Sequence, residues 1–218
     1  MTPIDKQRLD RWFHRVQREF EPLAQRFVGR KINYVEIGTW AGAACEWVSK
    51  NILTTHPESR GFGIDPYPKD RKKYDVEAIK ALAASRVSFL GDRWRWIYQP
   101  SSLGLLKLRK WLKPGTLDLL YIDGAHEASE VVQDFVLAWP LLHPGSVVVF
   151  DDFWCPRGND RSWPNVAEAV RSIHISWRGL IKPIGEHSRQ HAIEVKHMAL
   201  GPLREREALM QAFPVVKF

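Results

Sequence analysis

The sequence predicts an α/β domain with a seven-stranded, mostly parallel sheet and helices on both faces. Short, almost continuously apolar runs alternate with longer stretches whose apolar residues recur every three or four positions. Such runs are typical of parallel strands buried on both faces. An acidic residue or a glycine ends each of the first five runs. The last two runs are joined by a few polar residues, which is too short for a parallel crossover, so we expect an antiparallel hairpin there.

Composition limits the class of protein. With 218 residues, 44% hydrophobic and 26% charged, the chain is long enough for one domain with a sizeable core and is too apolar to be disordered. No apolar run approaches the roughly 20 residues of a membrane helix, and the first ten residues have no signal-peptide core. The two cysteines, Cys45 and Cys155, have neither metal-site nor disulfide spacing. We therefore expect a cytoplasmic protein with no membrane contact.

Residues 1–30 are predicted to form an amphipathic helix ahead of a domain of residues 31–218. Apolar residues recur at helical spacing over 4–28, from Leu9 and Trp12 to Phe27, and Gly29 is a typical stop signal. We expect this helix to cap the site or to form a homo-oligomer contact. Residues 1–31 hold more than half of the formal net charge of +7. Because no nucleic-acid-binding motif is present, we expect that basic face to be solvated.

The remaining elements follow in order and are separated by turn residues. Pro66 follows the second strand, and Pro–Gly pairs at 114–115 and 144–145 end two helices. Helices are predicted at 42–53, 76–84, 101–112, 127–142 and 166–175. Strands are predicted at 32–37, 61–64, 87–90, 117–122, 147–150, 180–185 and 192–198.

The ends of the first five strands form a row of carboxylates and glycines. Ligands of open parallel sheets bind beyond the carboxyl ends of the strands, so this row predicts a binding site. At the second and third strand ends, Asp65 is placed to accept hydrogen bonds from ribose hydroxyls and Asp92 from an adenine amino group. The row consists of Glu36 with Gly38, Asp65, Asp92, Asp123, and Asp151 with Asp152.

The first turn, residues 36–42, indicates the kind of ligand. Gly38 and Gly42 permit a tight turn and close backbone approach. A dinucleotide-binding turn needs a further glycine where Trp40 stands, and Glu36 disfavours a phosphate. The turn therefore suits a ligand that carries an amino or cationic group.

Acids at the fourth and fifth strand ends predict a metal site. Asp123 and Asp151 are 28 residues apart, which is about one strand–helix unit, so their strands are expected to be neighbours. Asp152 follows directly, and both acids can bind one ion only if the backbone turns there. Three carboxylates without a thiolate favour Mg²⁺ over zinc.

The turn 35–42 and the stretch 117–152, with Asp123-Gly-Ala-His126 and the Asp151–Asp152 pair, resemble class I S-adenosylmethionine-dependent methyltransferases. The first motif is similar to that of catechol-type O-methyltransferases, and the second to a bacterial small-molecule group that includes macrolide-sugar O-methyltransferases. The resemblance covers roughly 32–152. It implies a Rossmann-like fold and His126 as the general base. It also implies Mg²⁺ at Asp123, Asp151 and Asp152, and S-adenosylmethionine at Glu36, Gly38, Trp40, Gly42, Asp65, Asp92 and Asp123.

The implied function is methylation of a hydroxyl on a small-molecule acceptor, such as a sugar or a natural product. One departure concerns Ala44, which stands where the family often has a Ser or Thr that holds the cofactor's carboxylate. Segment 153–164, rich in Trp, Pro and Arg, is expected to form a lid over the acceptor. Four alternatives stay open: a metal-free methyltransferase, a nicotinamide-dependent oxidoreductase, a Rossmann-like binding module without turnover, and an RNA methyltransferase.

Overall fold

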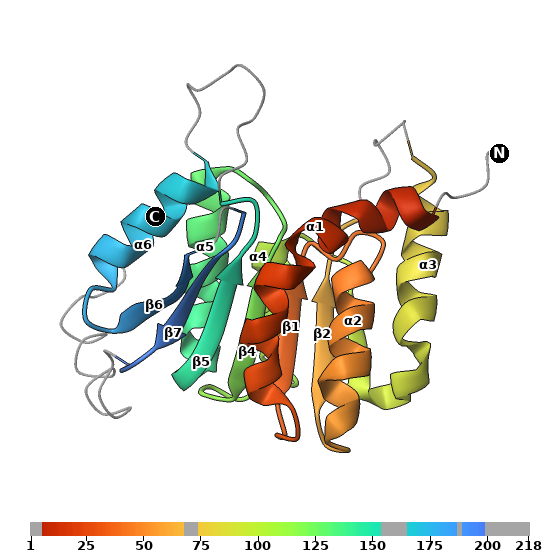
Figure 1. The fold of residues 1–218 in the computed structure, drawn as a ribbon, viewed down its shortest axis with the longest axis horizontal. Coiled ribbons are helices and arrows are strands. Elements are labelled where there is room, and N and C mark those ends of the chain that lie inside the picture. The colour runs from red at the N-terminus through yellow and green to blue at the C-terminus, as the bar shows by residue number, and fades with distance from the viewer. Residues whose placement is uncertain (1–5, 68–73, 154–164, 187–188, 199–218) are drawn as a thin grey trace, which may run out of the picture.

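The computed structural model describes residues 6–67, 74–153, 165–186 and 189–198 (Figure 1). Within them, seven strands form one sheet in the order β3-β2-β1-β4-β5-β7-β6. The first five strands are parallel, and β7 runs antiparallel to both β5 and β6. The predicted fold class is therefore confirmed. The strands are β1 (Asn33–Ile37), β2 (Arg60–Ile64), β3 (Trp94–Ile97), β4 (Leu117–Ile122), β5 (Leu142–Phe150), β6 (Ile181–Glu186) and β7 (His191–Val195).

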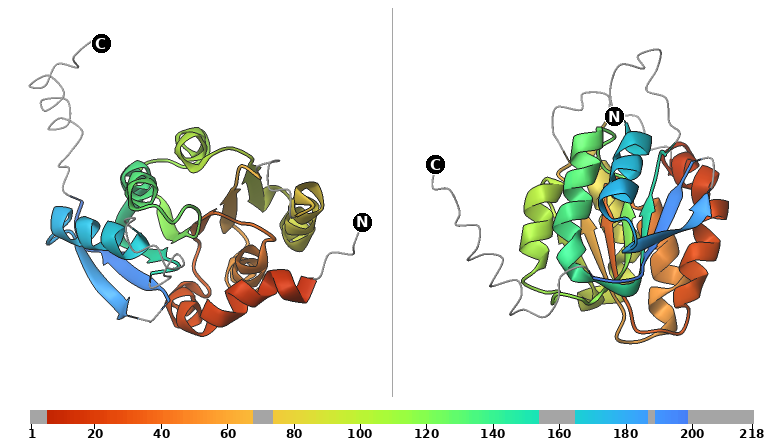
Figure 2. Two further views of the ribbon diagram at one scale, coloured as in Figure 1. Left: turned by 90° about the horizontal axis from the view of Figure 1, so that it is seen from above. Right: turned by 90° about the vertical axis from the view of Figure 1, so that its left-hand side faces the viewer.

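Helices cover both faces of the sheet (Figure 2). One face carries α1 (Lys6–Ala24), α2 (Ala43–Asn51) and α3 (Val76–Val87), and the other carries α4 (Ser101–Leu108), α5 (Ala128–Ala138) and α6 (Val166–Ser176). None of the described helices is both long enough and apolar enough to cross a membrane. Short 3₁₀ helices lie between them at η1 (Gln25–Phe27), η2 (Leu53–Thr55), η3 (Ser88–Arg93) and η4 (Trp139–Leu141).

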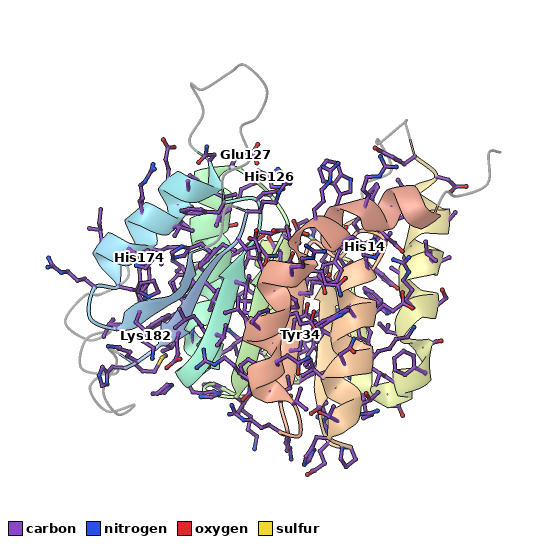
Figure 3. The ribbon with its side chains drawn as sticks, viewed as in Figure 1. His14, Tyr34, His126, Glu127, His174 and Lys182 are labelled. Atoms are coloured by element: carbon purple, nitrogen blue, oxygen red, sulfur yellow. The ribbon has the colours of Figure 1, made fainter. Side chains whose placement is uncertain are left out.

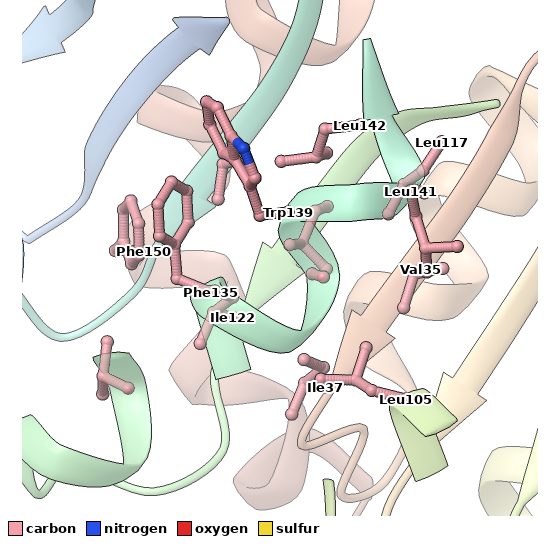
Figure 4. Close-up of a cluster of buried hydrophobic side chains, with 14 of the residues drawn as sticks. Val35, Ile37, Leu105, Leu117, Ile122, Phe135, Trp139, Leu141, Leu142 and Phe150 are labelled. Atoms are coloured by element: carbon pink, nitrogen blue, oxygen red, sulfur yellow. The ribbon is translucent and has the colours of Figure 1, made fainter. Parts of the chain in front are cut away.

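The strands divide their buried side chains between two core clusters, because successive residues of a strand point to opposite faces. Val35 and Ile37 of β1 pack with α4, α5 and α6, whereas Tyr34 packs with α1 and α2. Figure 4 shows the first cluster, in which Phe135 of α5 lies against Phe150 of β5 with ring centroids 5.9 Å apart. This two-sided burial explains why the strands are almost continuously apolar in sequence.

The apolar stripe of α1 is buried within its own chain. Phe13, Val16, Phe20 and other stripe residues are below 9% exposed, and the ring centroid of Phe20 lies 4.9 Å from that of Tyr121 on β4. Trp12 differs, because 64% of it is exposed. Hence α1 is part of the domain core, and its first turns project beyond the sheet.

The strand predicted at 87–90 is wrong. Val87 ends α3 and Leu90 lies in η3, whereas β3 begins at Trp94. The two apolar residues are buried at a spacing of three, which a helical segment satisfies as well as a strand does. As a consequence, Asp92 precedes β3 and lies at the amino edge of the sheet. The predicted lid falls almost entirely on residues 154–164, outside the described residues.

Candidate active site

A cavity of about 570 Å³ opens at the carboxyl ends of the parallel strands. The turn after β1, the end of β2, the start of α4, the loop after β4 and the first turns of α1 all contribute to its wall. Among the described residues that line it, four are acidic and none is a lysine or an arginine: Asp65, Asp123, Glu130 and Asp152. The cavity therefore favours cationic ligands.

The glycine turn after β1 adopts a backbone conformation that glycine permits. Gly38 has φ +83° and Gly42 has φ +77°. A Cβ on Gly38 would lie 2.0 Å from the carbonyl oxygen of Asp123, so the turn and the β4 end are packed directly against each other. Trp40 also has a positive φ, +43°, and its side chain lines the cavity. Gly42 then begins α2 as its N-cap.

Asp65 fixes the shape of this turn from the end of β2. Its Oδ2 accepts a hydrogen bond from the Trp40 amide at 2.9 Å, and its Oδ1 accepts one from the Tyr67 amide at 2.8 Å. The Tyr67 hydroxyl in turn donates to the Trp40 carbonyl at 2.6 Å. Asp65 also lines the cavity, as its expected role toward ribose hydroxyls requires. No pattern in the sequence indicated Tyr67.

Glu36 lies below the turn rather than in the cavity wall. It is 2% exposed, and its Oε2 accepts a hydrogen bond of 2.6 Å from the Tyr34 hydroxyl. The Cys45 thiol also donates to it. Burial raises the pKa of Glu36 to about 7. Its contacts are therefore with the protein beneath the turn, and any effect on a ligand passes through the turn.

Three side chains converge beyond β4 and β5. One ligand atom each from Asp123, His126 and Asp152 lies within 4.8 Å of the other two, and His126 Nε2 is 3.0 Å from Asp152 Oδ2. In Figure 3, His126 lies at the upper end of the sheet. Burial raises the pKa of Asp123 well above its usual range, and the charges of Asp151 and Asp152 raise it further.

Asp151 and Asp152 have different surroundings because the backbone turns between them, with φ +54° at Asp152. Asp151 is buried, and its Oδ2 accepts a hydrogen bond from the Tyr121 hydroxyl at 2.8 Å. Its Oδ1 is buried without a hydrogen-bond partner among the described residues. Burial raises the pKa of Asp151 to about 6. In the described part of the chain, the group that could hold a metal ion is Asp123, His126 and Asp152, so the predicted ligand Asp151 lies outside it and His126 takes its place. The repulsion between the carboxylates and the unpartnered Oδ1 of Asp151 are compatible with a divalent cation nearby, and carboxylate oxygens are ligands that Mg²⁺ prefers.

Four predicted site residues do not line the cavity, namely Glu36, Gly42, Asp92 and Asp151, and other residues do. Asp92 is exposed and lies outside the cavity, because it precedes β3 instead of following it. The cavity wall near the carboxyl end of β3 is formed instead by Pro100, Ser101 and Ser102 at the start of α4. Leu9 and Trp12 of α1 also line the cavity, whereas the sequence singled out neither of them within a helix expected to cap the site or to contact a second copy. Their helical spacing alone places them in a buried stripe.

Comparison with known proteins agrees with this geometry. The family model for a methyltransferase domain matches residues 35–153. The uncharacterized protein R132 of Acanthamoeba polyphaga mimivirus is 27% identical to this chain over 175 residues. The match covers 78% of this chain and 73% of the viral protein.

Solved structures share the fold. The O-methyltransferase from Bacillus cereus, in complex with S-adenosylhomocysteine, has a TM-score of 0.58 at 18% identity, over 89% of this chain and 94% of its own. MycE methyltransferase of the mycinamycin pathway, in complex with Mg, S-adenosylhomocysteine and mycinamycin VI, has a TM-score of 0.60 at 16% identity, over 89% of this chain and 56% of its own. CalS11, a TDP-rhamnose 3′-O-methyltransferase, has a TM-score of 0.56 at 17% identity, over 88% of this chain and 87% of its own.

The family match spans the glycine turn, Asp65, Asp123, His126 and Asp152, which are the residues that the cavity brings together. The mostly parallel seven-stranded sheet and its antiparallel last pair are those that the sequence predicted. This chain therefore belongs to the methyltransferase-domain family and has the Rossmann-like fold of the S-adenosylmethionine-dependent enzymes.

Proposed function

We propose that the protein transfers a methyl group from S-adenosylmethionine to a hydroxyl of a small molecule, with His126 as the base and a divalent cation at the acidic cluster. One observation supports this most strongly. The glycine turn and Asp65 line the same cavity as Asp123, His126 and Asp152. A methyl donor and an acceptor bound there would be held side by side, and positioning of this kind is a large part of catalysis.

The cofactor supplies a methyl group already activated on a sulfonium, so the protein has to bind and orient it. The turn at Gly38 and the carboxylate of Asp65, which both line the cavity, suit the ribose end of the cofactor. The acidic lining attracts the sulfonium and the ammonium groups, and Trp40 adds an aromatic wall for a cation. Because Ala44 has no hydroxyl, backbone amides at the start of α2 would hold the cofactor's carboxylate.

His126 is placed to take the proton from the acceptor. In the tautomer that donates Nε2–H to Asp152, at 3.0 Å, Nδ1 is left as the proton acceptor, and the carboxylate stabilises the imidazolium that forms. Asp123 and Asp152 would hold Mg²⁺. When bound, the cation would supply Lewis-acid chemistry that lowers the pKa of the acceptor hydroxyl.

Two titrations and a turnover assay test this proposal. S-adenosylhomocysteine is titrated first, and Mg²⁺ is then titrated into the complex. Asp123→Asn and Asp152→Asn should weaken Mg²⁺ binding at least tenfold, and Asp151→Asn should do the same if its free oxygen is a ligand. His126→Ala should keep Mg²⁺ binding and lose transfer of labelled methyl to a panel of hydroxylated small molecules. Loss of metal binding in His126→Ala would instead make His126 a ligand.

Binding of S-adenosylhomocysteine without any transfer, to either a hydroxyl panel or a matching amine panel, would favour the binding module that the sequence left open. Transfer to amines alone would overturn the choice of oxygen as the acceptor atom. If a chelator left turnover unchanged, the metal would have no part in catalysis and His126 would act as the base without it.

A further inference from the structure

Arg86 is a buried cation outside the cavity that touches three separate elements. Its side chain on α3 is only 2% exposed. Nη1 donates a hydrogen bond to the carbonyl oxygen of Ala41 at 2.8 Å, and Nη2 donates to Asp10 Oδ1 of α1 at 2.5 Å. Nε lies 3.3 Å from Glu46 Oε2 of α2. One guanidinium therefore joins α1, α2 and the glycine turn.

The contact with the turn bears on the cofactor end of the cavity. Ala41 lies between Trp40 and Gly42 and is 1% exposed, so its carbonyl has little freedom once Arg86 binds it. Because guanidinium donors form a rigid planar fork, the direction of the Ala41 carbonyl and the position of Asp10 are fixed relative to each other. A ligand that orders the glycine turn would therefore also order the Arg86 side chain, which holds Asp10 of α1.

The contact with α1 bears on the opposite wall of the cavity. Asp10 is flanked by Leu9 and lies two residues before Trp12, and both of these line the cavity. Leu9 also packs on the apolar cluster that contains Ala41. Figures 1 and 2 show the first half of α1 lying across the end of α2 towards α3. The part of α1 that closes the cavity is thus the part that Arg86 holds.

We propose that Arg86 is a positioning residue that couples cofactor binding at the glycine turn to the seating of α1 over the cavity. The consequence is positive coupling: bound cofactor favours the seated α1, which offers Leu9 and Trp12 as a formed wall to the acceptor. The coupling is reciprocal, so weakening the Asp10–Arg86 pair also weakens cofactor binding. This inference rests on the proposed function only in taking the turn to be the cofactor site.

Hydrogen exchange of α1 with and without S-adenosylhomocysteine tests the coupling. In the wild type, ligand should slow amide exchange in the first half of α1 by about tenfold. Asp10→Asn keeps Glu46 as a charge partner for Arg86 and so should fold. It should lose the ligand-dependent slowing and bind S-adenosylhomocysteine about fivefold more weakly, at the low end of ordinary coupling. Arg86→Lys, which keeps the charge but not the fork, should behave in the same way.

Arg26→Ala is the matched control. Arg26 follows α1 and pairs with Glu194 of β7, away from the turn, so the variant should keep both the ligand-dependent slowing and the affinity. Ligand binding without any change of exchange in wild-type α1, or ligand-dependent slowing that survives in Asp10→Asn, would overturn the coupling alone. Failure of the wild type to bind S-adenosylhomocysteine would overturn the proposed function and the coupling together.

Discussion

Replacing Glu36 with glutamine should remove a defined part of the pH dependence of stability. Burial raises the pKa of Glu36 from its ordinary 4.5 to about 7, so the folded state binds this proton more tightly than the unfolded chain does. The free energy of unfolding therefore falls as the pH rises from about 4.5 to 7. A shift of this size corresponds to about 3 kcal/mol, of which about 2–3 kcal/mol is lost between pH 5 and pH 8.

The variant should not show this loss. A glutamine carbonyl can still accept the hydrogen bond from Tyr34, so the buried hydroxyl keeps a partner. Urea unfolding followed by tryptophan fluorescence would measure both proteins at pH 5 and pH 8. The stability of Glu36→Gln relative to the wild type should rise by about 2–3 kcal/mol between the two pH values.

Glu58→Gln is the control, because Glu58 is exposed and pairs with Lys31 at the surface. It should show no comparable change. A constant difference between Glu36→Gln and the wild type across this pH range would refute the argument that burial of Glu36 destabilises its charged form.

Three further predictions concern the turn, the base and the core. Gly38→Ala should lower the free energy of unfolding by at least about 3 kcal/mol and abolish S-adenosylhomocysteine binding. Gly145 also has a positive φ, but its Cβ would meet nothing within 4 Å, so Gly145→Ala should cost about 1 kcal/mol in urea unfolding. Equal costs for the two variants would refute the clash between the Gly38 Cβ and the Asp123 carbonyl. His126→Ala should lower turnover at least about 100-fold and leave the S-adenosylhomocysteine affinity within about twofold; a large loss of affinity in calorimetry would contradict its role as base. Phe20→Ala, at a site 0% exposed, should cost about 3–5 kcal/mol in thermal or urea unfolding; a cost below about 1 kcal/mol would show that α1 is not part of the core.

The sheet could be predicted from sequence because its strands are apolar on both faces and its turns carry proline and glycine. The third strand was the exception. Residues 87–90 are apolar enough for a strand, but the buried positions Val87 and Leu90 belong to helical segments, and the true strand contains an exposed arginine, Arg95. Tertiary packing determines which of the two segments forms the third strand, and no local sequence pattern indicates that choice.

The site was predictable to the extent that it depends on strand ends. Asp65 and Asp123 follow β2 and β4, and the end of a parallel strand fixes where its next residue lies. Contacts between distant segments were not predictable. Arg86 lies 76 residues from Asp10 and 45 from Ala41, and the different surroundings of Asp151 and Asp152 follow from one positive φ angle.

The cavity as the cofactor site is tested most directly by calorimetric titration of S-adenosylhomocysteine into three proteins: the wild type, Asp65→Ala and Asp92→Ala. Both aspartates follow from the sequence pattern, but only Asp65 lines the cavity. We expect binding to the wild type in the micromolar range, an affinity at least about tenfold lower in Asp65→Ala, and an unchanged affinity in Asp92→Ala. Binding that is lost in Asp92→Ala and kept in Asp65→Ala would contradict the cavity as the cofactor site.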